Sequence, residues 1–250
     1  MFKKLTTPTL LFVTIFLFFI SACNKNDKHM PVTSLSMKPE SGFAKTTSDT
    51  IMLSDAKALI KKIIFKNEEV EEDHDGEDDE GDDKGEHGDS CELKLKRGPL
   101  VVSLNLSGGL SEIVAGSVRF GIYDRVKFEI HKVKDEDAVS DTAFFDDSMR
   151  FSIVIDGLYN GTPFRYKSKE SIEVKMKIDP PLLIDDSTDV ANVTFVVDPS
   201  QWFKKDGVVL DPNKEENRDD IDKSIKISFK RAFKDCDHDG KENDDDDRDD

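Results

Sequence analysis

Residues 151–178 read FSIVIDGLYNGTPFRYKSKESIEVKMKI, the clearest β pattern in the chain. β-prone runs stand on both sides of Asn160-Gly161, and Asn-Gly between two such runs is the strongest short-range signal for a hairpin, because both turn residues need positive φ. From Ile172 to Ile178 every second residue is apolar, and Glu or Lys fills each position between. Such strands have one buried side and one wet side, as antiparallel strands covering a core do.

The same alternation recurs along the chain outside this stretch. It is found on either side of Gly98-Pro99, over residues 126–130 and over residues 193–197. The sequence therefore predicts six or seven antiparallel strands. Two such sheets packed face to face form an antiparallel β-sandwich, immunoglobulin-like or similar, so we expect a mainly β fold.

One helix is predicted near the C-terminus, over residues 213–234. Pro212 suits the first helical turn behind Asp211. Apolar residues then recur at about one turn: Ile221, Ile225, Phe229 and Ala232. We expect this stripe to pack on the sandwich, or the helix to be mobile beside it.

Residues 54–66 fit two structures. The spacing of their apolar residues fits a helix with Ser54 as its N-cap, and periodicity alone favours that helix. The runs Ile51–Leu53 and Ile63–Phe65 fit strands instead.

Charge is distributed very unevenly. The chain has 53 acidic and 36 basic residues, a net charge of −17 that argues against a nucleic-acid partner. Residues 67–90 carry fourteen acids and one Lys, and residues 235–250 carry ten acids and two bases. The remaining body is nearly neutral. Such acidic runs cannot bury enough apolar surface to fold alone, so we predict a disordered loop over 67–90 and an acidic tail over 235–250.

The N-terminus indicates export. Lys3 and Lys4 precede an apolar run too short to span a membrane, and residues 20–23 read Ile-Ser-Ala-Cys. This resembles the lipobox of bacterial lipoproteins, which implies cleavage of a signal peptide 1–22 and diacylation of Cys23. An ordinary secretory signal or an uncleaved anchor are the alternatives. We expect a tether over 23–50 and a location in the bacterial cell envelope, on the outer membrane, with the membrane as a partner.

The body also resembles a family. TIMLSDAKALIKKIIFK at residues 50–66, GPLVVSLNL at 98–106, the Asn-Gly hairpin and DPSQWF at 198–203 follow in an order similar to that of uncharacterised β-sandwich lipoproteins of Gram-negative bacteria. The resemblance covers about 51–234. It implies a strand at 57–66 and a variable loop at 67–90, and it brings no catalytic residues.

The sharpest chemical motif is Asp235-Cys236-Asp237-His238-Asp239-Gly240. Calcium loops use D-x-D-x-D-G because alternate carboxylates in a tight turn converge on one hard cation. The remaining ligands would be the Lys241 carbonyl, Asn243 and Asp246. Asp at the twelfth position and the lack of a second helix predict weak binding. The other interpretation is a chance match in an Asp-rich tail.

Other site candidates are few. Export implies an oxidising compartment. A disulfide between Cys91 and Cys236 is then one alternative, and two free thiols are the other. Trp202 and Phe203 fit a core plug, or an exposed aromatic pair for sugar or protein contact. A paired-carboxylate site is one interpretation of the acids in a polar loop, and solvated loop acids are the commoner case; these acids are Asp135, Asp137, Asp146 and Asp147.

Motifs of known enzyme classes are absent: H-E-x-x-H, G-x-S-x-G, the P-loop and G-x-G-x-x-G. We therefore expect a non-enzymatic envelope lipoprotein whose acidic segments bind divalent cations. The alternative is a module that binds a carbohydrate or an envelope protein.

Overall fold

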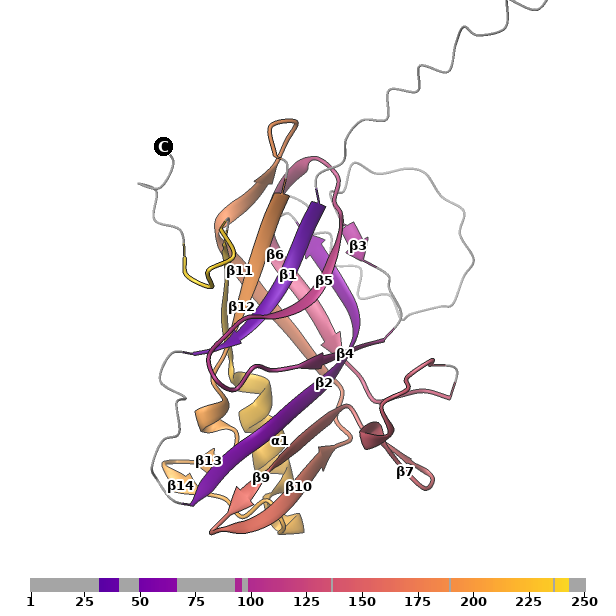
Figure 1. The fold of residues 1–250 in the computed structure, drawn as a ribbon, viewed down its shortest axis with the longest axis vertical. Coiled ribbons are helices and arrows are strands. Elements are labelled where there is room, and N and C mark those ends of the chain that lie inside the picture. The colour runs from indigo at the N-terminus through magenta and orange to yellow at the C-terminus, as the bar shows by residue number, and fades with distance from the viewer. Residues whose placement is uncertain are drawn as a thin grey trace, which may run out of the picture.

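A computed structural model describes residues 32–40, 50–66, 93–95, 99–135, 137–188, 190–235 and 237–242. The described chain is mainly β, as predicted, with one α-helix near its C-terminal end. Its principal strands are β1 Val32–Pro39, β2 Ile51–Lys66, β3 Leu93–Leu95, β4 Leu100–Ser103, β5 Ser111–Ser117, β6 Gly121–Ile130, β9 Ile153–Tyr159, β10 Thr162–Ser168, β11 Ile172–Ile184, β12 Val190–Val197 and β15 Phe229–Lys234. The order β10-β9-β2-β6-β11-β15-β12-β1-β5 links them in one sheet, with β3 and β4 paired to β2 (Figure 1).

The sheet curls into a half-barrel, and the structure does not confirm two separate sheets. Pairing runs without a break from β10 to β5, so the two flanks face each other as parts of one curved sheet. The pairing is also not wholly antiparallel. β1 pairs with β12 in parallel, and β11 pairs with β15 in parallel. The sequence missed these parallel pairs because alternation reports which face is buried and is silent on strand direction.

The predicted hairpin is confirmed. β9 and β10 are antiparallel, and Tyr159 pairs with Thr162 across a two-residue turn. Asn160 has φ 49° and Gly161 has φ 77°, the positive values that this turn requires. The turn chemistry fixes the register, because the loop length leaves one way to pair the two strands.

The ambiguous segment is a strand, as the family resemblance implied and against the helical periodicity. β2 pairs with β9 over its first half and with β6 over its second half. Ile63, Ile64 and Phe65 are all buried, so both faces of this end are covered. A strand covered on both faces loses the polar alternation by which strands are recognised, and this explains the false helical signal.

The predicted tether over 23–50 is wrong for part of its length. Residues 32–39 form β1, which lies between β12 and β5. Leu35 and Met37 point into the core, while Ser34 and Ser36 are buried on the other face. Leu35 and Met37 are the only large apolar side chains that indicate a strand here in the sequence. Whether this segment forms a strand therefore depends on its pairing with β12 and β5, far along the chain.

The predicted helix over 213–234 is too long. The helix α1 covers Arg218–Ile227, behind a 3-10 turn at Glu215–Asn217, and Phe229–Lys234 is the strand β15. β15 fills the space between β11 and β12, and its backbone groups pair there. Tertiary pairing therefore overrides the one-turn spacing of Phe229 and Ala232.

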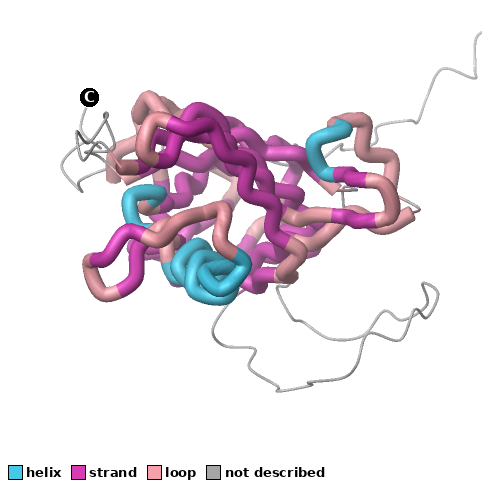
Figure 2. The backbone as a smooth tube through the Cα atoms, turned by 90° about the horizontal axis from the view of Figure 1, so that it is seen from below, coloured by secondary structure: helices cyan, strands magenta, loops and turns pink. Residues whose placement is uncertain are grey.

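One hydrophobic core fills the curl, and α1 covers its open side (Figure 2). Ile221 and Ile225 are the buried residues of α1 that enter this core. Tyr166 of β10 donates a hydrogen bond to Asp222 of α1 at 2.8 Å. Burial, reinforced by the Asp222 carboxylate, raises the pKa of Tyr166, so its hydroxyl stays a donor.

The smaller elements lie around this body. The short hairpins are β7 Phe145–Asp146 with β8 Met149–Arg150, and β13 Lys204–Lys205 with β14 Val208–Val209; two further 3-10 turns cover Thr142–Phe144 and Pro199–Gln201. A second small apolar cluster lies beneath the first hairpin. No helix among the described residues is long and apolar enough to cross a membrane.

Candidate metal centre

The D-x-D-x-D-G loop begins directly after β15 and is anchored by its first residue. The Asp235 amide donates to the Asn192 carbonyl of β12 at 3.0 Å, continuing the β12–β15 pairing by one bond. The Asp235 side chain is fully buried. The start of the predicted acidic tail is therefore part of the folded body.

Asp235 uses one carboxylate oxygen for structure. Its Oδ2 accepts hydrogen bonds from Thr194 Oγ1 at 2.8 Å, from the Gly240 amide at 3.0 Å and from Asn192 Nδ2 at 3.3 Å. Its Oδ1 is buried and has no hydrogen-bond partner among the described residues. A buried carboxylate oxygen without a partner is costly, so Asp235 Oδ1 is a candidate ligand atom.

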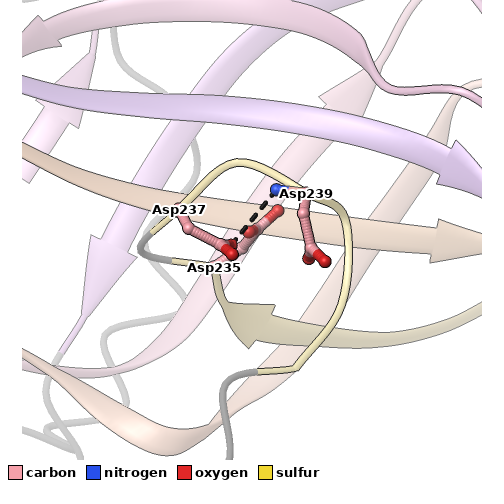
Figure 3. A group of neighbouring side chains, drawn as sticks. All are labelled: Asp235, Asp237 and Asp239. Atoms are coloured by element: carbon pink, nitrogen blue, oxygen red, sulfur yellow. Dashed lines mark hydrogen bonds between the residues drawn. The ribbon is translucent and has the colours of Figure 1, made fainter. Parts of the chain in front are cut away.

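Two further carboxylates converge on Asp235. One oxygen each from Asp235, Asp237 and Asp239 lie within 4.8 Å of one another. Figure 3 shows the three side chains gathered within the arc of the loop, where the Asp239 amide donates to Asp237 Oδ1 at 3.2 Å. His238 has φ 60° and Gly240 has φ 77°, and these two positive values bend the chain tightly enough to bring the carboxylates together.

The spacing of the three carboxylates is compatible with a bound metal ion. Calcium binds oxygen at 2.3–2.6 Å, so two oxygens on one ion are at most about 5 Å apart. Three oxygens within 4.8 Å of one another meet this condition. A cation at this point could be held by one oxygen from each of the three carboxylates.

Basic side chains now compensate part of the negative charge. Lys241 Nζ lies 2.5 Å from Asp239 Oδ2. This contact is the main reason that the pKa of Asp239 is lowered and that of Lys241 raised. Lys38 of β1 donates to the Gly240 carbonyl, which ties the loop to the strand beneath it.

Lys241→Ala is expected to strengthen cation binding. The ammonium competes with a cation for Asp239, whereas the backbone carbonyl that position seven supplies is retained. Lys241 is largely exposed, so removing it should increase affinity by a modest factor of about two to five. Calcium titration by calorimetry checks this, with Lys226→Ala on α1 as the charge-matched control. Unchanged or weaker binding by Lys241→Ala would contradict the competition.

Several predicted site residues lie outside the described chain. These are Cys23, Cys91, Cys236, Asn243 and Asp246. Lipidation of Cys23, the disulfide between Cys91 and Cys236 and the last two calcium ligands therefore stay predictions. The described part of the motif, Asp235, Asp237, Asp239 and Lys241, is brought together in one loop.

The sequence missed the residues that hold the loop from below. Asn192 and Thr194 lie on the outer face of β12, and Ser34 of β1 donates to Asn192 Oδ1 at 2.9 Å. Ser34 Oγ also lies 3.4 Å from His238 Nε2 of the loop. The available signal was the polar residues Asn192 and Thr194 in an otherwise apolar strand.

The aromatic pair is not a ligand-contact site. Trp202 and Phe203 are 5% and 3% exposed, and both belong to the core. Trp202 Nε1 donates to Ser228 Oγ at 2.7 Å, and Phe203 packs edge-on against Phe164 and Tyr166. The core-plug interpretation is confirmed, and the exposed cluster expected of a sugar- or protein-binding face is not found at these residues.

The loop acids are engaged separately. Asp146 Oδ2 lies 3.6 Å from Lys167 Nζ, and Asp135 forms an ion pair with Arg150 at 3.3 Å. Asp147 has φ 45° and its carbonyl accepts from Arg150. These contacts give Asp146 and Asp147 a structural role in the β7–β8 hairpin.

Comparison with known proteins adds no neighbour, since no family model, curated protein or solved structure matches the chain.

Proposed function

We propose that this protein is a non-enzymatic, lipid-anchored component of the bacterial cell envelope that binds a divalent cation, calcium, in the loop from Asp235 to Gly240. The observation that carries the cation site is the fully buried Asp235, which has one carboxylate oxygen without a hydrogen-bond partner among the described residues. One oxygen each from Asp235, Asp237 and Asp239 lie within 4.8 Å of one another. The lipobox-like residues 20–23 support the envelope location.

The donor set favours a hard cation. The described loop offers carboxylate oxygens, which suit calcium and magnesium better than zinc or copper. Magnesium needs a near-ideal octahedron and gives up its water reluctantly, whereas calcium tolerates irregular sites with more ligands. An open loop of this kind corresponds to a dissociation constant of roughly 10⁻⁴–10⁻³ M, as in extracellular modules.

The test is a calcium titration of residues 24–250, which include every described residue. We expect saturable heat with one site and a weaker response to magnesium. Asp237→Asn combined with Asp239→Asn should weaken calcium binding at least about a hundredfold, because two of the three charged ligands are lost.

A matched control separates a site from a general attraction to negative charge. Glu215→Gln combined with Glu216→Gln removes the same charge from largely exposed side chains in the 3-10 turn before α1. Calcium affinity should be unchanged in this variant. If both double variants lose the heat equally, or if magnesium reproduces it, the acidic chain acts as a polyelectrolyte and the proposed site is refuted.

A further inference from the structure

Exposed apolar side chains gather at one end of the half-barrel. We call Val32, Phe120, Ile122 and Leu183 the apolar rim; they are 41–50% exposed. Ile122 pairs with Leu183 across β6 and β11, and Val32 pairs with Val190 and Ser117 at the same end. Figure 1 shows the start of β1 and the β5–β6 and β11–β12 connections together at the upper end of the molecule.

The candidate metal centre is close to this end. Ser34, which contacts His238 of the loop, is two residues beyond Val32 in β1. Two residues of a strand span about 7 Å. In Figure 1 the loop after β15, in yellow, lies beside β11 and β12 just below the upper end.

The described part of the chain begins at this end, with Val32 of β1. Eight residues lie between Cys23 and Val32, so nine Cα-to-Cα steps separate the two. Fully extended they reach at most about 30 Å. A chain anchored through Cys23 therefore holds the apolar rim and the metal centre near the lipid headgroups. This step rests on the proposed function, because it assumes the lipid anchor.

The metal centre is open on the outward side. Asp235 is buried beneath the loop, whereas Asp237 and Asp239 are exposed. Calcium takes six to eight oxygen ligands. A calcium ion held by the three aspartates of this loop would therefore have coordination positions free for oxygen atoms of another molecule. A phosphate oxygen is a hard anionic ligand of the right kind. Without a cation the three carboxylates would repel that phosphate, which makes the contact cation-dependent.

We propose that this end of the half-barrel docks on an anionic phospholipid bilayer, with the bound calcium bridging the three aspartates to lipid phosphate while the apolar rim contacts the acyl boundary. The cation supplies attraction to the anionic surface, and the apolar side chains supply buried area. Neither part suffices alone, because the rim is small and a bare acidic loop is repelled.

Vesicle co-sedimentation of residues 24–250, which lack the acylated cysteine, tests this docking. The vesicles are phosphatidylcholine with phosphatidylglycerol, and pure phosphatidylcholine serves as the neutral surface. Calcium should increase binding to the anionic vesicles at least about tenfold over chelator, and binding to the neutral vesicles should stay low.

Two paired variants separate the rim from the cation site. Ile122→Ser with Leu183→Ser should weaken vesicle binding about tenfold and leave the calorimetric calcium affinity unchanged. Val208→Ser with Ile227→Ser is the matched control, since these residues are 65% and 68% exposed but lie in β14 and α1. This control should bind vesicles as the parent does.

The outcomes distinguish the two proposals. Calcium binding by calorimetry without calcium-dependent vesicle binding overturns the docking and leaves the cation site standing. Equal loss in the rim variant and its control also overturns it, because the rim would then have no special part. Absence of calcium binding itself refutes the proposed function, and the docking fails with it.

Discussion

Trp202→Ala is expected to destabilise the protein by about 3–5 kcal/mol, the usual cost of truncating a buried tryptophan. The side chain is 5% exposed, and its ring lines an apolar cavity of about 30 Å³ together with Ile225 and Phe229. Truncation would enlarge a space that already exists, and it would remove the hydrogen bond to Ser228. Trp202 thus links the segment between β12 and β13 to Ser228, the residue that joins α1 to β15.

Urea unfolding followed by circular dichroism measures this loss, because Trp202 is the single tryptophan and fluorescence would be lost with it. Trp202→Phe retains most of the apolar volume and should cost less, about 1–2 kcal/mol. Val208→Ala, at a 65% exposed residue, is the surface control and should change little. A cost below about 1 kcal/mol for Trp202→Ala, with red-shifted emission of the parent, would contradict the core assignment.

The extent to which sequence predicts this fold depends on the range of the interaction. The β9–β10 hairpin follows from Asn160-Gly161 and its neighbours, so local chemistry suffices. β1 is different: its buried Ser34 contacts Asn192 of β12 and His238 of the loop after β15, which lie 158 and 204 positions further along the chain. β15 likewise becomes a strand because β11 and β12 leave a place between them. In both segments tertiary context decides: composition indicates a tether where β1 lies, and periodicity indicates a helix where β15 lies.

The candidate site likewise has one part that local sequence predicts and another that depends on distant residues. Asp235, Asp237 and Asp239 are predictable because spacing in a tight turn brings their carboxylates together. The depth of the site is not, because Asp235 is buried by Asn192 and Thr194, more than forty residues earlier in the chain. The sequence places Asp235 in an acidic tail, whereas the structure makes it the buried member of the group.

Asp235→Asn is expected to abolish cation binding while leaving the fold intact. The amide oxygen of Asn can accept the three hydrogen bonds that Oδ2 accepts from Thr194, Gly240 and Asn192. Its NH₂ group would replace the unpartnered Oδ1, and an amide nitrogen does not bind calcium. Because the substitution also removes a buried charge, the cation-free stability should stay within about 1 kcal/mol of the parent.

Thermal unfolding with and without calcium reads out both effects. At calcium tenfold above the dissociation constant, the parent should gain about 1.4 kcal/mol, or about 3–6 °C in Tm, because the ligand binds only the folded state. Asp235→Asn should unfold near the cation-free parent and gain nothing from calcium. Asp235→Ala removes the acceptor of the Thr194 hydroxyl and the Gly240 amide and one of the two acceptors of Asn192 Nδ2, so it should be destabilised by about 2–3 kcal/mol with or without calcium. If Asp235→Asn kept the calcium-induced gain, Asp235 would be a structural residue alone, and the loop would bind its cation without it.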